Sequence, residues 1–167
     1  MRRIWLLAVV SILLVGAAAS SALAGKDVPF KAHADRVSAG LLGPNPVCPE
    51  GYVGEDSESL GTGTHLGRFH LFETLCLGFR TPPIAPFEVH GELVAANGDH
   101  LTSRVDDGFN LITGEMTSSG WVFTGGTGRF ASAEGHAEEL LIRDSEGTLI
   151  GVNAVGTITF DASDRSR

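Results

Sequence analysis

The sequence predicts an all-β domain, because three features of antiparallel sheets recur along it. Residues 87–95 alternate apolar and polar side chains at period two, as a half-buried strand does. Asn97-Gly98 follows this run directly, and this pair is the strongest two-residue hairpin signal, with positive φ required at both positions. Glycine-rich turns separate the other strand-like runs, and helical periodicity is almost absent. This pattern supports an antiparallel barrel or sandwich.

Seven or eight short strands fit the chain. The clearest lie at residues 28–37, 64–77, 87–95, 99–105, 115–124, 138–143 and 148–160. The last two form a second predicted hairpin around Asp144-Ser145-Glu146-Gly147. Residues 41–60 are predicted to be a long loop tied down at Cys48, and residues 81–86 a proline-stiffened break. Residues 161–167 are expected to form a flexible tail.

The first 24 residues have the pattern of a secretory signal peptide. Arg2 and Arg3 precede an apolar run at residues 4–19, and Ala22-Leu23-Ala24 supplies small residues for cleavage. An uncleaved membrane anchor is the alternative, and the processing site favours cleavage. No later apolar stretch approaches the ~18 residues that span a bilayer. We therefore expect an exported domain at 25–160, periplasmic or extracellular, without a membrane span.

The charge balance bears on the class of partner. The chain has 12 Lys+Arg and 20 Asp+Glu, a net charge of -8. Removing residues 1–24 deletes two arginines and no acid, so 12 − 2 = 10 basic residues remain against 20 acidic ones, a net charge of -10. Such a chain lacks the basic face that neutralises phosphates, which argues against a nucleic-acid partner.

Cys48 and Cys76 are the only cysteines in the sequence. In an oxidising compartment they are expected to form a disulfide, and closing a loop of about 29 residues would stabilise the fold by roughly 3.5 kcal/mol. Two free thiols, one of them catalytic, are the alternative. No Cys-x-x-Cys motif supports redox chemistry.

Residues 125–130, Gly-Gly-Thr-Gly-Arg-Phe, form the most distinctive motif. The stretch 126–131 formally matches the dinucleotide-binding pattern G-x-G-x-x-A, but no βαβ unit surrounds it. We predict instead a tight turn between two strands. Gly125, Gly126 and Gly128 would allow positive φ or close backbone approach, and Phe130 would anchor the turn in the core.

The run from Trp121 to Phe130, with Ala131 and Gly135, resembles the Gly-Gly-Thr-Gly-x-Phe turn of the allene oxide cyclase/dirigent β-barrel superfamily. Residues 63–69 and 95–99 resemble exported bacterial members of that superfamily. The resemblance implies an eight-stranded antiparallel barrel over about residues 28–160, often a homodimer or homotrimer. Its members include cyclases and proteins that steer radical coupling, all acting on apolar substrates inside the barrel. Catalytic residues do not carry over, because the matching segments are turns and strand starts.

Among the six histidines, His90 and His100 form the best candidate site, together with Glu92 between them. The three side chains could share one face of a hairpin, as a metal site or an acid–base pair requires. The opposite row of residues 87–95 is apolar, so a solvated outer face is the stronger interpretation. We therefore predict no metal and no cofactor. A Ser-His-Asp triad stays open by composition, but no Gly-x-Ser-x-Gly elbow supports one.

These features predict a barrel that binds a small apolar ligand or a partner, because an eight-stranded barrel is just wide enough to hold one small ligand. The residues expected to line its cavity are Phe69, Leu71, Leu93, Trp121 and Phe123. An isomerase or cyclase is the first alternative, with Glu73 or Arg68 as acid or base at the mouth. A packed interaction module is the second. Ligand binding requires a cavity of about 300 Å³, and catalysis further requires an ionisable group inside it.

Overall fold

A computed structural model describes residues 26–78, 84–110, 116–117 and 120–160, with the backbone alone at 84–87, 106–110 and 116–117. Its strands are β1 (Val28–Ala39), β2 (Tyr52–Gly63), β3 (Gly67–Gly78), β4 (Ile84–Ala95), β5 (His100–Asn110), β6 (Met116–Thr117), β7 (Trp121–Gly126), β8 (Glu134–Arg143) and β9 (Leu149–Thr159). They confirm the predicted all-β fold. The predicted signal peptide (1–24) and tail (161–167) lie outside the described residues.

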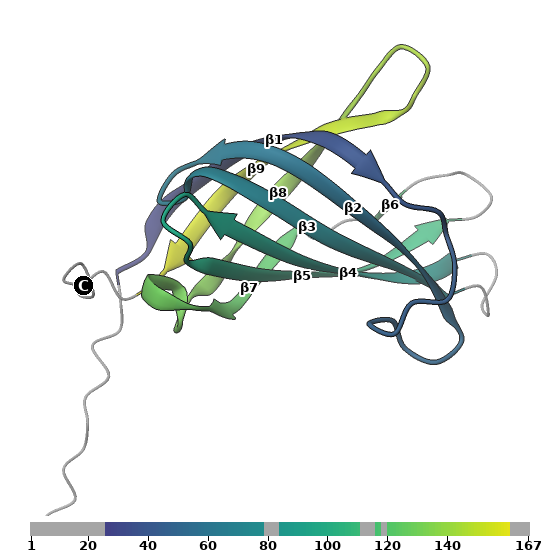
Figure 1. Cartoon of the computed structure of the whole chain (residues 1–167), viewed down its shortest axis with the longest axis horizontal. Coiled ribbons are helices and arrows are strands. Elements are labelled where there is room, and N and C mark those ends of the chain that lie inside the picture. The colour runs from purple at the N-terminus through teal and green to yellow at the C-terminus, as the bar shows by residue number, and fades with distance from the viewer. Residues whose placement is uncertain (1–25, 79–83, 111–115, 118–119, 161–167) are drawn as a thin grey trace, which may run out of the picture.

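Eight strands close into an antiparallel barrel (Figure 1). Each strand from β1 to β5 pairs with the next, β5 pairs with β7, and the series β7, β8 and β9 closes onto β1. The two-residue β6 pairs with Gly108 and Phe109 of β5. Within the described residues, no helix has the length and hydrophobicity needed to cross a membrane.

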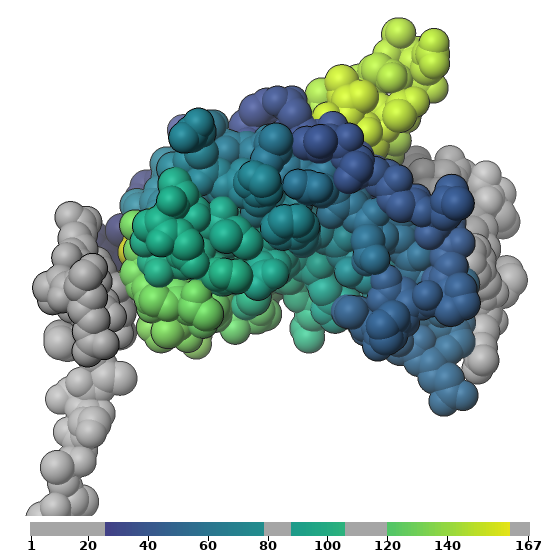
Figure 2. Space-filling view, viewed as in Figure 1, coloured from purple at the N-terminus to yellow at the C-terminus, as the bar shows by residue number. Residues whose placement is uncertain are grey.

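Both predicted hairpins are present, although the first has a different turn. Gly98 has φ 86° and donates a hydrogen bond to the Ala95 oxygen, whereas Asn97 is not among the residues with positive φ. The connection is therefore a three-residue loop that ends in a left-handed glycine, not a two-residue loop. The second hairpin, at residues 144–148, projects from the barrel (Figure 1, Figure 2). In it the Asp144 carboxylate accepts hydrogen bonds from the amides of Glu146 and Thr148.

The loop predicted at 41–60 is wrong for residues 52–60, which belong to β2. The connection between β1 and β2 is therefore shorter than predicted. Near its start it pairs with β2, because Gly43 and Gly54 exchange backbone hydrogen bonds of 2.9 and 2.7 Å. The predicted disulfide between Cys48 and Cys76 is confirmed and ties this connection to β3. A side chain at Gly54 would put its Cβ 2.9 Å from the Cys48 sulfur, so this glycine permits the close approach.

The barrel interior is tightly packed at the end where β7 turns into β8. The Phe30 ring lies edge-on to Phe123 with centroids 4.7 Å apart, and edge-on to Trp121 at 6.5 Å. Phe130, which is fully buried, packs in the same way against Phe160 at 5.4 Å. This end of the barrel is therefore filled by aromatic side chains.

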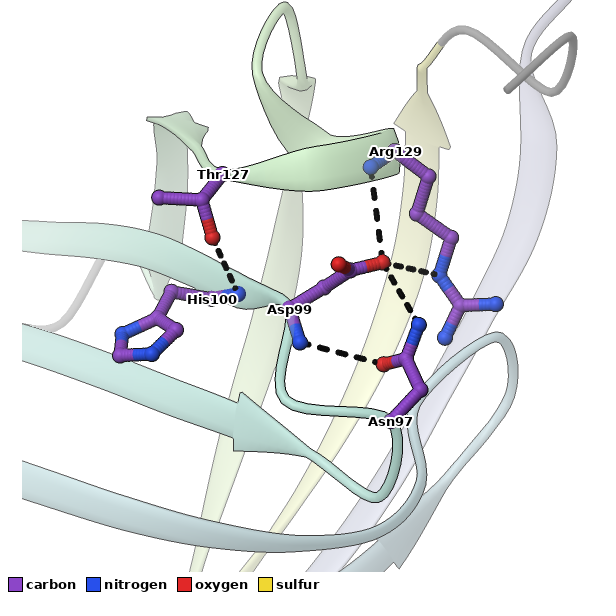
Figure 3. Close-up of polar contacts among 5 residues, drawn as sticks. All are labelled: Asn97, Asp99, His100, Thr127 and Arg129. Atoms are coloured by element: carbon purple, nitrogen blue, oxygen red, sulfur yellow. Dashed lines mark hydrogen bonds and ion pairs between the residues drawn. The ribbon is translucent and has the colours of Figure 1, made fainter. Parts of the chain in front are cut away.

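The glycine-rich motif closes this packed end (Figure 3). Its residues Gly128–Phe130 form a single 3₁₀ turn, η1, at which Gly128 has φ 54°. The Asp99 carboxylate, from the β4–β5 turn, accepts a 2.7 Å hydrogen bond from Asn97 and lies 3.6 Å from Nε of Arg129. The Thr127 hydroxyl accepts a hydrogen bond from the His100 amide at 2.9 Å. These contacts fix two turns to each other, which gives the motif a structural role.

A charged cavity at the open end of the barrel

A cavity of about 310 Å³ occupies the other end of the barrel. The inward row of β3 shows the transition, because Leu71 is fully buried whereas Glu73, Leu75 and Leu77 line the cavity. The apolar lining residues are Leu75, Leu77, Val89, Val105, Leu141, Leu149 and Val152. The polar and charged ones are Arg36, Ser57, Ser59, Glu73, Glu139 and Arg143. The cavity thus combines aliphatic walls with a group of ionisable side chains.

The five residues predicted to line the cavity lie elsewhere in the barrel. Their side chains are all buried in the core, at exposures of 0–3 %, and none of them lines the cavity. These residues are Phe69, Leu71, Leu93, Trp121 and Phe123. Alternation along a strand identifies the side chains that face inward. It does not indicate where along the barrel axis these side chains pack tightly and where they leave a cavity.

Arg36 brings a positive charge into the barrel from β1. Its guanidinium donates a 2.6 Å hydrogen bond to the Glu55 carboxylate of β2, and each side chain is about one-fifth exposed. Charge-assisted pairs of this kind are strong when they are partly buried. The pair offsets the Arg36 charge within the protein, whereas the buried Nε of Arg36 has no hydrogen-bond partner.

Glu73 is the ionisable group most affected by the cavity. It lies on β3 between Ser57 of β2 and Gly91 of β4. Burial, the largest cause, and the nearby Glu139 carboxylate raise the pKa of the Glu73 carboxyl to about 7 against the opposing effect of the Arg36 guanidinium. Among the described residues, none of the side-chain hydrogen bonds or ion pairs involves the Glu73 carboxyl. Glu73 therefore exchanges a proton near neutral pH.

Gly91, which pairs with Glu73, leaves room for the Ser103 side chain. A Cβ at this position would lie 2.4 Å from the Ser103 hydroxyl and 3.7 Å from a methyl group of Leu71. Any side chain at residue 91 would therefore displace Ser103. This glycine is required by side-chain space inside the barrel, because its φ is not in the left-handed region.

The two residues considered as an acid or base at the mouth have different positions. Glu73 lines the cavity, as expected for that role. Arg68 lies on the outward row of β3 and is exposed near the packed end. Arg68 therefore cannot act in the cavity, because it lies on the outer face of β3 and at the opposite end of the strand from the cavity.

The His90, Glu92 and His100 group lies on the outer surface, as the stronger interpretation predicts. His100 contacts Glu92 at 2.6 Å, whereas His90 contacts Glu88 at 3.3 Å. These side chains are between 35 and 48 % exposed. No cluster of three or more potential metal ligands occurs in the described part of the chain.

Sequence reasoning missed Arg36, Glu55 and Glu139 as site residues, although a signal for Arg36 exists. Arg36 continues the inward row of Phe30, Ala32 and Ala34, and a charged residue in an apolar row deserves a functional interpretation. Comparisons with protein-family models, curated proteins and solved structures find no match for this chain.

Proposed function

We propose that this protein is an exported barrel of the allene oxide cyclase/dirigent type that binds one small, largely apolar ligand in the cavity at its open end. The observation that supports this proposal most directly is the cavity of about 310 Å³, a volume at the lower end of the usual range for small-molecule sites. Its aliphatic walls suit an apolar body, and Glu73 offers that body one polar anchor.

The size of the cavity sets what the walls can contribute. A ligand that buries about 200 Å² of apolar surface gains roughly 5 kcal/mol from the hydrophobic effect, before the cost of association. That gain alone corresponds to weak binding, near the millimolar range. A polar contact at the charged end is therefore needed for useful affinity and for orientation of the ligand.

Native mass spectrometry tests the binding. Protein purified from an exporting host, without reducing agent, should retain an additional mass of a few hundred daltons. Val89→Phe places a ring in the cavity and should remove that mass. Val94→Phe, on the outward row of the same strand, is the matched control and should keep it. Equal retention by V89F and the parent protein would show that the ligand binds elsewhere. The same spectrum reports the subunit count and the N-terminal cleavage site.

An isomerase or cyclase is a second candidate, favoured by the position of Glu73. A carboxyl with a pKa of about 7 can both donate and accept a proton near neutral pH, as general acid–base catalysis requires. Extraction of the retained molecule from the parent protein and from E73Q distinguishes the two functions. Catalysis predicts two isomers of the same mass that separate by chromatography, whereas binding alone predicts one compound in both.

A further inference from the structure

We propose that the ligand is a cation, a hydrophobic amine whose ammonium group lies against the Glu73 carboxylate and whose apolar body extends along the aliphatic walls. This inference rests on the proposed ligand-binding function and names the chemical class of the ligand.

Charged side chains of both signs lie around the cavity. Among the described residues they are the guanidinium groups of Arg36 and Arg143 and the carboxylates of Glu55, Glu73 and Glu139. Arg36 is engaged with Glu55 at 2.6 Å, and Arg143 is exposed and donates a 2.8 Å hydrogen bond to the Gly147 oxygen. Glu73 is the carboxylate of this group for which the described residues supply no ion-pair partner.

A charge among aliphatic side chains has a large free-energy cost. An ionised carboxyl in such surroundings is unfavourable unless a countercharge with hydrogen-bond donors accompanies it. Burial already displaces Glu73 toward its protonated form, and Glu139 adds to this effect. An ammonium group would supply both the countercharge and the donors. The hydroxyls of Ser57 and Ser59, which line the same cavity, can accept the remaining N–H groups.

Other classes of head group fit Glu73 less well. A carboxylate ligand would meet Glu73 and Glu139 with like charge, and the Arg36 guanidinium, although its Nε has no hydrogen-bond partner, already donates to Glu55. An alcohol could hydrogen-bond but would leave the ionised Glu73 carboxyl without a countercharge. The expected order of affinity for one hydrocarbon chain is therefore amine first, alcohol second and carboxylate last.

The proposal also predicts how binding depends on pH. Among the described residues, the charged groups around Glu73 are Arg36 on β1, Glu55 on β2, and Glu139 and Arg143 on β8, whereas the described lining residues of β4, β5 and β9 carry none. An ammonium group selects the ionised form of Glu73, so amine affinity rises with pH through neutrality. If the ionised form alone is competent, the rise is about 30-fold between about pH 5.5 and 8.5.

Isothermal titration calorimetry of the purified protein with octylammonium, octan-1-ol and octanoate tests the inference. We expect octylammonium to bind at least about 10-fold more tightly than the alcohol, equivalent to roughly 1.4 kcal/mol. Glu73→Gln should remove that advantage. Glu138→Gln is the matched control, because it removes the same charge from the outward row of β8 and should keep the advantage.

The other outcomes of the calorimetry distinguish failure of the cationic ligand from failure of the binding function. Alcohol or carboxylate binding as tight as amine binding, lost in V89F, would overturn the cationic ligand and leave the proposed binding function intact. Amine binding that is unchanged in E73Q, or that does not rise with pH in the parent protein, would also overturn it. Failure of all three probes to bind would count against the binding function itself.

Discussion

Glu73 on β3 and Glu139 on β8 line one cavity from strands that are not neighbours in the barrel. Closure of the sheet brings them together, and the Glu139 carboxylate adds to burial in raising the pKa of Glu73 to about 7. An ionised Glu73 carboxyl among aliphatic side chains reduces the stability of the fold. We therefore infer that this arrangement serves the proposed ligand or reaction.

The first prediction concerns the pH dependence of stability. Glu73 has an ordinary pKa near 4.5 in the unfolded chain and about 7 in the folded protein. Between these values the folded state holds a proton that the unfolded state has released, so this group makes stability fall as pH rises. Glu73→Gln should match the parent protein near pH 4.5 and exceed its free energy of unfolding by up to about 3 kcal/mol above pH 7. Urea denaturation at a series of pH values measures the difference.

Glu138→Gln serves as the control here too, because Glu138 is exposed on the outer surface. Its free energy of unfolding should follow that of the parent protein at every pH to within about 0.5 kcal/mol. A constant difference between E73Q and the parent protein across the pH range would contradict the raised pKa of Glu73.

The strand β2 was predicted as a loop because its inward row is not apolar. β2 has Ser57, Ser59 and Gly61 on its inward row, because Ser57 and Ser59 face the cavity and Gly61 lies against the Phe69 ring. No apolar alternation remains to be detected, so the segment resembles a loop. The hairpins and β4 were predictable because their inward rows pack against other side chains.

The site itself was predictable in part. Glu73 could be selected as an ionisable residue in a predicted strand, but the sequence does not indicate that Glu139 lies across the barrel from it. That relation depends on closure of the sheet between β9 and β1, which is a pairing of distant segments. Local periodicity contains no information on such pairings.

The second prediction concerns the packed end. Trp121 is 1 % exposed and contacts the Phe30 ring, so Trp121→Ala should cost about 3–5 kcal/mol of unfolding free energy. Val122→Ala changes the adjacent outward side chain, which is 41 % exposed, and should cost less than about 1 kcal/mol. Chemical denaturation compares the two. A loss below 1 kcal/mol for W121A would place this ring on the outer face of β7.

The third prediction concerns the glycine-rich turn. Gly128 and Gly147 both have positive φ, at 54° and 85°, so alanine is strained by about 1 kcal/mol at either position. A Cβ at Gly128 would also lie 2.0 Å from the Asp99 carboxylate, whereas a Cβ at Gly147 meets nothing within 4 Å. Gly128→Ala should therefore be at least about 1 kcal/mol more destabilising than Gly147→Ala, because Asp99 must leave its hydrogen bonds. Equal losses in thermal denaturation would show that Asp99 moves aside freely.

The fourth prediction concerns the Cys48–Cys76 disulfide, which joins residues 28 positions apart. It restricts the unfolded chain, and the loop-entropy model gives about 3.5 kcal/mol for its contribution to stability. A double Cys48→Ala, Cys76→Ala variant should lose an amount of that order in urea denaturation, and reduction of the parent protein should have the same effect. Adding reductant to the double variant is the control, since it has no sulfur bridge to break. If the parent protein lost less than about 1 kcal/mol on reduction, the connection at residues 40–51 would be held by its Gly43–Gly54 hydrogen bonds and not by the sulfur bridge.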